Sequence, residues 1–247
     1  MTLPLHLVGH EALVGRGPGD VVVLDGPEGR HAATVRRTRA GEHLLLTDGL
    51  GLRVEGEVVA VGAGTVELRV LSTGVDPEPS PRFVLVQALA KNDRDHQAVE
   101  AATECGVDEV VPWQASRCVV QWRGDRGDKA WRKWDALLVA ATKQSRRTRR
   151  PVLAPPATTA DLEARVTGAA AAFLLHEDAQ APLATVVLPD AGDVLLVVGP
   201  EGGISPEELA TLTAAGATPV RLGSTVLRSS SAGPAALAVL SAMSRWR

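Results

Sequence analysis

Two loops in the second half of the chain contain the residue types from which small-molecule pockets are built. The first is VVGPEGGISPEE at 197–208, where an apolar strand ends in a glycine turn before a capped helix with proline at its first position. Gly199, Gly202 and Gly203 would let the backbone approach a ligand closely and present N–H groups to it. The loop has neither the lysine of a Walker motif nor dinucleotide-fingerprint spacing. A tight turn without a ligand is the alternative interpretation.

The second loop is RLGSTVLRSSSAGPAAL at 221–237. A strand ends at Leu222-Gly223, and a loop containing Arg228 and three serines leads to a helix predicted from Ala232. This loop offers backbone hydrogen-bonding groups, one cation and small hydroxyls at a helix N-terminus, which suit a polar or anionic ligand. A helix start capped by serine is the simpler alternative. His176, at the end of another predicted strand, is either part of a pocket or structural.

Three basic or aromatic features could contact a nucleic acid. The tract KQSRRTRR at 143–150 suits phosphates through Lys143, Arg146, Arg147, Arg149 and Arg150, unless it is only a solvated face. Arg30, His31, Arg36 and Arg37 form a smaller basic group, with ordinary surface charge as its alternative. Four of the five tryptophans, at 113, 122, 131 and 134, lie in or beside the basic third of the chain and could stack on bases. The spacing of Trp131 and Trp134 favours core packing for those two.

The elements that must position these residues change in type near residue 75. Residues 1–74 are rich in short Val- and Leu-containing strands with glycine turns, which predicts a small antiparallel barrel. The proline-rich residues 75–81 are predicted to be a linker. Residues 82–247 alternate apolar strands, at 83–89, 107–112, 171–176, 193–199 and 219–223, with helices at 93–106, 128–145 and 205–216. That alternation predicts an α/β domain, in which ligands bind at the carboxyl ends of strands.

Composition and charge argue against a membrane-spanning, secreted or metal-binding protein and leave a nucleic-acid-binding protein open. The 247 residues include 26 basic and 29 acidic ones, a net charge of −3, yet residues 117–150 hold 11 basic and 3 acidic ones. This local excess of +8 leaves a polyanionic partner open. The longest apolar run, at 169–175, is too short to cross a membrane, and we expect no secretory signal. Two cysteines without metal-ligand spacing predict a cytoplasmic protein without a metal.

Taken together, the motifs resemble the ribosomal small-subunit methyltransferase E family, the 16S rRNA (uracil-N3)-methyltransferases of the SPOUT superfamily. The resemblance runs along nearly the whole chain. Its strongest elements are Gly199-Pro-Glu-Gly-Gly203 and Leu222-Gly-Ser-Thr-Val-Leu-Arg228. It also rests on shorter matches at 31–37, 48–51, 88–91, 100–106, 117–119 and 144–147.

The resemblance implies a PUA-like barrel that binds RNA and a C-terminal α/β domain with a trefoil knot. It implies a homodimer that uses S-adenosylmethionine to methylate N3 of a uridine in the decoding region of 16S rRNA, in the assembled small subunit. The cofactor-binding positions that it implies are Leu175, His176, Gly199, Glu201, Gly202, Gly203, Leu222, Gly223, Val226, Leu227, Arg228 and Ser229.

Catalysis is expected to involve Arg228, which could hold the uracil as an anion. Many relatives carry glutamate at the position of Ser230, so a general base at that position is in doubt, and Glu201 and solvent are the other candidates. Two alternatives stay open: a non-catalytic RNA-binding or ribosome-assembly factor with a degenerate site, and a SPOUT methyltransferase that acts on another RNA.

Overall fold

The computed structural model describes residues 3–246, and these divide into two compact units. Residues 3–78 and 142–150 form the first unit, and residues 79–141 and 151–246 form the second. The basic tract at 143–150, which begins in the last turn of the long helix at 124–144, therefore packs with the first unit. No stretch of sequence could indicate this assignment, because it depends on contacts between residues about seventy to one hundred positions apart.

The first unit is a five-stranded sheet with strand order β1-β3-β4-β5-β2. Its strands are β1 (Leu5–Leu7), β2 (Val21–Leu24), β3 (His43–Thr47), β4 (Leu52–Val61) and β5 (Val66–Val75). The pairs from β3 to β2 are antiparallel, as the alternating sequence predicts, and β1 adds a parallel edge strand. Alternate Val and Leu side chains of β2 to β5 form its buried core.

Three short helices complete this unit: α1 (His10–Leu13), α2 (Gly26–Arg30) and the π-helical turn η1 (His31–Val35). The basic residues Arg30 and His31 lie within the helical segment at 26–35, whereas strands and turns alone were predicted for residues 1–74. Asp25 at the N-cap and Pro27 in the first turn favour that helix start.

A partly buried ionic cluster links the basic tract to helix α2. Glu28 accepts from Lys143 Nζ at 2.6 Å, and its other oxygen lies 2.8 Å from Nδ1 of the buried His6. Burial alone would raise the pKa of Glu28, but the hydrogen bonds from His6 and Lys143 and the Lys143 charge lower this pKa to about 2. The ionised carboxylate is therefore the form that the folded unit stabilises.

We expect Glu28→Gln to reduce the free energy of unfolding at pH 7 by about 2–3 kcal/mol. The folded pKa lies below the ordinary value of 4.5, so the stabilisation is present above 4.5 and is lost as the pH falls toward about 2. Chemical denaturation of both proteins from pH 7 to pH 2.5 checks this, with the exposed Glu11→Gln as control. A variant whose deficit stays constant over this range would contradict it.

The second unit is a six-stranded parallel sheet with strand order β11-β9-β10-β6-β7-β8. Its strands are β6 (Arg82–Ala88), β7 (Glu109–Trp113), β8 (Val152–Leu153), β9 (Ala171–Leu175), β10 (Asp193–Val198) and β11 (Thr218–Val220). The central strands β6 and β10 are buried along almost their whole length, which explains their continuous apolar sequence. The predicted α/β class is confirmed, and the structure shows that the sheet is parallel.

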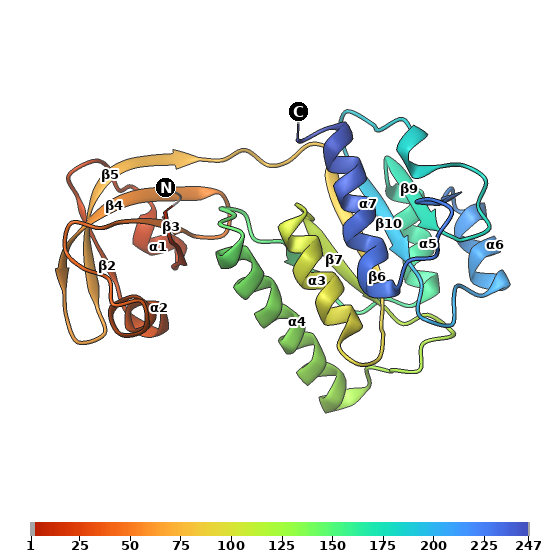
Figure 1. Ribbon diagram of the computed structural model, residues 1–247, viewed down its shortest axis with the longest axis horizontal. Helices are drawn as coiled ribbons and strands as arrows, with labels where there is room; N and C mark the ends of the chain where they lie inside the picture. Colours follow the sequence, from red (N-terminus) through yellow and green to blue (C-terminus); the bar gives the residue numbers. More distant parts are fainter. Residues whose placement is uncertain (1–2, 247) are drawn as a thin grey trace. The chain divides into compact units, whose positions relative to one another are not determined.

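Helices cover both faces of this sheet (Figure 1). They are α3 (Arg94–Glu104), α4 (Gly124–Gln144), α5 (Thr159–Gly168), α6 (Pro206–Ala214) and α7 (Ser229–Met243), with a 3₁₀ turn η2 (Leu183–Thr185). The helices α3 and α7 pack on each other and on β6, and α5 packs on α6. The capped start of α6 at Ser205 matches the sequence prediction.

Two helices begin earlier than the sequence indicated. Helix α4 begins at Gly124 rather than 128, and α7 begins at Ser229 rather than Ala232. Arg228 is the N-cap of α7, and its carbonyl oxygen accepts from the backbone N–H groups of Ser231 and Ala232. The three serines are thus the first turn of the helix and not the end of a loop. Helix α5, capped by Thr158 and Asp161, was missed although its capping box is visible in the sequence.

Candidate functional site

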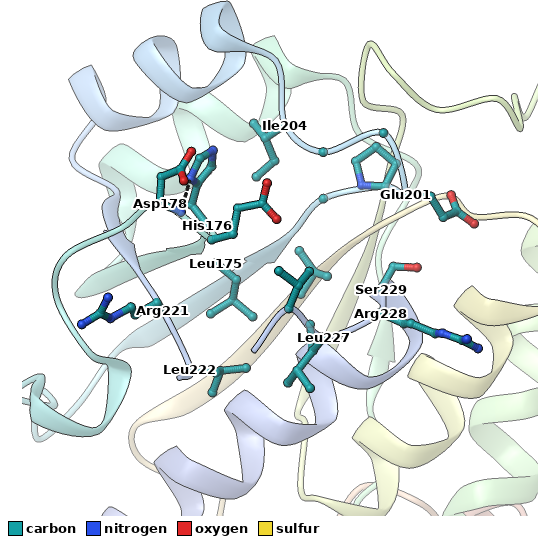
Figure 2. A pocket seen from close by; sticks show the side chains of 18 of the residues that line it. Leu175, His176, Asp178, Glu201, Ile204, Arg221, Leu222, Leu227, Arg228 and Ser229 are labelled. Carbon is teal, nitrogen blue, oxygen red and sulfur yellow. Dashed lines mark hydrogen bonds between the residues drawn. The ribbon is translucent and has the colours of Figure 1, made fainter. Parts of the chain in front are cut away.

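Three neighbouring parallel strands of the second unit end at one cavity. The cavity has a volume of about 800 Å³ and lies where Leu175 ends β9, Val198 ends β10 and Val220 ends β11. The two loops that the sequence singled out follow β10 and β11, so the strand order β11-β9-β10 brings both to this place (Figure 2). The predicted position of a site, at the carboxyl edge of the sheet, is where the cavity lies.

Every residue assigned to the cofactor by sequence lines this cavity. They are Leu175, His176, Gly199, Glu201, Gly202, Gly203, Leu222, Gly223, Val226, Leu227, Arg228 and Ser229. Ser230, assigned to catalysis, is partly buried in the first turn of α7 and is not among the lining residues.

The turn after β10 depends on its glycines. Gly203 has a φ of +72°, a left-handed conformation that disfavours side chains, and its N–H donates to Pro200 O at 2.9 Å. A Cβ on Gly199 would lie 2.7 Å from Cγ1 of the buried Ile204, which forms part of the cavity wall. The absence of side chains lets the turn fold tightly and leaves its backbone facing the cavity.

A buried carboxylate holds this turn against the loop after β7. Glu208 accepts from the Ser116 N–H at 2.7 Å, from the Ser205 N–H at 3.1 Å and from the Thr159 hydroxyl at 2.9 Å. Burial would raise the pKa of Glu208, but these hydrogen bonds outweigh it and lower the pKa. Its role in the capping box was visible in the sequence, whereas its contacts to Ser116 and Thr159 were not.

Three arginines that the sequence did not assign to the pocket also line it: Arg94, Arg117 and Arg221. Arg94 Nη1 lies 3.4 Å from Glu201 Oε1, which also accepts from the Lys91 N–H at 3.1 Å. Arg117 Nη1 donates to Gly202 O at 3.0 Å. Arg117 belongs to a motif that carried the resemblance, and this was the available signal. Arg94 had none, because its partner Glu201 is distant in sequence.

The start of α7 contributes a cation and a hydroxyl (Figure 2). Arg228 is exposed, and its guanidinium has no hydrogen bond or ion pair with any residue between 3 and 246. Ser229 is buried, and its Oγ has no partner within the described part of the chain. A buried hydroxyl without a partner costs free energy, and a ligand in the cavity could supply that partner.

His176 follows β9 in the wall of the cavity, and its position is fixed by two hydrogen bonds. Its N–H donates to Val220 O at 2.9 Å, and its Nδ1 accepts from the Asp178 N–H at 3.2 Å. This arrangement continues the sheet beyond the strand end and holds the imidazole beside the cavity.

The predicted RNA-binding residues differ in their availability. Arg30, His31, Arg36 and Arg37 are exposed on or just after the α2–η1 helical segment. In the basic tract Lys143 is paired with Glu28, and Arg149 donates to the carbonyl oxygens of Asp76 and Pro77. Arg146 is exposed, whereas Arg147 and Arg150 are partly buried. Part of this tract thus stabilises the first unit.

Between residues 3 and 246, no group of three or more His, Cys, Asp or Glu side chains is placed to hold a metal ion. Within the same range, no helix is both long and apolar enough to cross a membrane.

Comparison with known proteins identifies the family. An RNA methyltransferase domain matches residues 77–241, and an RNA methyltransferase PUA domain matches residues 24–71. The ribosomal RNA small subunit methyltransferase E of Mycobacterium tuberculosis is 47% identical over 233 residues, covering 92% of this chain and 89% of its own length. This chain belongs to the ribosomal RNA small subunit methyltransferase E family. The family member of Bacillus subtilis is 25% identical over 226 residues, covering 88% of each chain.

Solved structures agree with this family membership. A methyltransferase from Legionella pneumophila, in complex with the bound cofactor S-adenosylmethionine, is 27% identical with a TM-score of 0.83 over 98% of both chains. The methyltransferase E of Neisseria gonorrhoeae, bound to S-adenosylmethionine, shares the fold at 23% identity, with a TM-score of 0.83 over 98% of both chains. The cofactor expected from the sequence is thereby confirmed for the family.

Proposed function

We propose that this protein transfers a methyl group from S-adenosylmethionine to N3 of a uridine in the decoding region of 16S rRNA, in the assembled small subunit. The observation that carries the proposal is that both predicted loops line one cavity at the ends of β9, β10 and β11. Membership in the methyltransferase E family supports the reaction class and the RNA substrate.

The cavity fits the cofactor. Its volume of about 800 Å³ is in the range of cofactor-binding pockets, and its glycine turn exposes backbone groups to a ligand. The buried Ser229 Oγ has no hydrogen-bond partner within residues 3–246, and the cofactor would supply one. We assign the binding of S-adenosylmethionine to the residues around Leu175, to the Gly199–Gly203 turn and to the Leu222–Ser229 loop. When bound, the cofactor supplies an electrophilic methyl group on its sulfonium.

The residues of the chain must then position the uracil and favour loss of its N3 proton. Arg228 provides positive charge at the edge of the cavity, and we assign it to stabilise the uracil anion. Of the candidate proton acceptors, Glu201 lines the cavity and Ser230 does not. Glu201 or water therefore accepts the N3 proton, and Ser230 takes no direct part in the reaction.

The proposal includes the finer features that the resemblance implied: a trefoil knot, a homodimer and a cytoplasmic location. The knot rests on membership in the methyltransferase E family, and the loops after β10 and β11, which would form it, meet at one cavity with β9 between the two strands. Val226 is 75% exposed at the cavity, and Leu227 beside it is also exposed. Apolar residues placed in this way support a partner subunit that completes the site.

Labelled methyl transfer tests the function directly. Small subunits from cells that lack this enzyme should accept one methyl group per particle, and mass spectrometry should place it on uridine N3. Transfer to another nucleotide would contradict the substrate assignment. Failure of S-adenosylmethionine to bind in calorimetry would instead favour a non-catalytic RNA-binding protein.

We expect the exposed arginines of the first unit to contribute to RNA affinity. The double variant Arg30→Ala, Arg36→Ala should reduce the slope of log K against log salt by about 1.4, since each phosphate contact contributes about 0.7 for single-stranded RNA. Binding measured over a salt series checks this value. The matched control is Arg53→Ala, Arg69→Ala, because both arginines already pair with carboxylates. Equal slopes for the two double variants would refute a specific role of Arg30 and Arg36.

A further inference from the structure

A second cavity of the same unit shares no lining residue with the first. Its volume is about 270 Å³, and it lies between the start of α4 and the segment that follows β8. The residues that line it are Trp122, Gly124, Gly127, Asp128, Trp131, Pro155 and Pro156. Gly124, Asp128 and Trp131 recur at helical spacing, so one face of α4 forms its wall.

Both indoles in this cavity are held in fixed orientations. The Trp122 ring packs edge-to-face on the buried Trp134, with ring centroids 5.0 Å apart, and the backbone N–H of Trp122 donates to Gln114 Oε1 at 3.1 Å. Trp131 Nε1 donates to Ala154 O at 3.0 Å. Each indole is partly exposed, so neither is simply core. Rigid aromatic surfaces bind a flat ligand at little cost in conformational entropy.

A glycine allows helix α4 to pack closely against Trp122. A Cβ on Gly127 would lie 2.9 Å from the Trp122 carbonyl carbon and 3.2 Å from its Cβ. The helix can therefore approach Trp122 only because this position has no side chain. Pro155 and Pro156, which also line the cavity, are exposed.

The charges around the cavity favour a polyanion with a flat apolar part. Arg123, Arg126, Lys129 and Arg132 are exposed in and just before the first turns of α4. The exposed carboxylate of Asp128 lies in the cavity wall. Tryptophan-lined grooves also bind proline-rich peptides, but these peptides gain nothing from the exposed cations next in sequence to the lining residues. Single-stranded RNA offers both phosphates and bases.

We propose that this cavity binds one unpaired guanine of the RNA substrate. The base stacks on the indole surfaces of Trp122 and Trp131, and its N1–H and N2–H groups donate to the Asp128 carboxylate. The neighbouring cations contact the flanking phosphates. Uracil has a single N–H donor, so the carboxylate discriminates between the bases. This site goes beyond the methyl-transfer pocket and rests on the proposed function only in that the substrate is RNA.

Fluorine NMR of the protein labelled with 5-fluorotryptophan tests occupancy. The probe is a ten-nucleotide RNA of uridines with one central guanosine, and the all-uridine RNA is its control. The guanosine RNA should shift the Trp122 and Trp131 resonances and leave that of the exposed Trp246 unchanged. If the first two resonances do not move at saturating RNA, the proposal is wrong.

Charge-matched variants test the role of the carboxylate. The wild type should bind the guanosine RNA about tenfold more tightly than the uridine RNA, the size expected for a paired base contact. Asp128→Asn should abolish this preference, whereas Asp125→Asn, which removes the same charge from an exposed position outside the cavity, should keep it. A preference that survives in Asp128→Asn would overturn the assignment.

The two proposals fail in different ways. Neither measurement involves methyl transfer. An enzyme that methylates small subunits but shows no guanosine-dependent shift would refute this site alone. A protein that shows the shift but methylates nothing would refute the proposed function and leave the guanine site standing.

Discussion

Arg228→Ala is expected to lower the rate of methyl transfer by about 10²–10³-fold, with less than about a threefold change in the Kd for S-adenosylmethionine. The guanidinium lies at the edge of the cavity without a partner among residues 3–246, so it is free to stabilise charge that develops on the uracil. Single-turnover transfer to unmethylated small subunits measures the first quantity, and calorimetry measures the second.

The controls for Arg228 separate charge from position. Arg228→Lys should recover part of the rate, because the charge is kept while the planar fork is lost. Arg221→Ala removes another arginine from the same cavity and should lower the rate much less. An equal loss in Arg228→Ala and Arg221→Ala, or a loss confined to cofactor affinity, would argue against a role of Arg228 in charge stabilisation.

Gly203→Val is expected to raise the Kd for S-adenosylmethionine by about 10–100-fold. The φ of +72° at this position costs about 1–2 kcal/mol for a side chain and more for a β-branched one, so the turn must change its conformation. That change moves the backbone that lines the cavity between Gly199 and Gly203. Calorimetric titration of the folded variant measures the effect.

The matched control is Gly216→Val. Gly216 also has a positive φ, +114°, with open space around its Cβ position, but it ends α6 outside the cavity. Both variants should lose a similar amount of stability, and only Gly203→Val should lose cofactor affinity. Comparable affinities in the two variants would show that the glycine turn does not form the cofactor site.

Local sequence signals determined much of this protein. The apolar runs of β6 and β10 and the capping box at Ser205 depend on near neighbours in the chain, so the α/β class was predictable. The glycine turn and the Arg228 loop were also predictable, because a tight turn that a ligand can approach closely requires glycines, and a loop that binds a polar ligand requires charged or hydroxyl side chains. The family resemblance then implied that the glycine turn and the Arg228 loop bind one cofactor. All the cofactor-binding residues that it implied line the same cavity.

Only the tertiary structure decided which distant residues meet. In the folded chain Arg94 lies beside Glu201. Lys143 and Arg149, which the sequence shows only as parts of one basic tract, make contacts that stabilise the first unit. The tertiary structure also moved the start of α7 to Ser229, so that Ser230 lies outside the cavity that Ser229 lines. The physical reason is that propensity and periodicity act over a few residues. Ion pairs, burial and cavity walls instead depend on contacts across about a hundred positions, which no local pattern encodes.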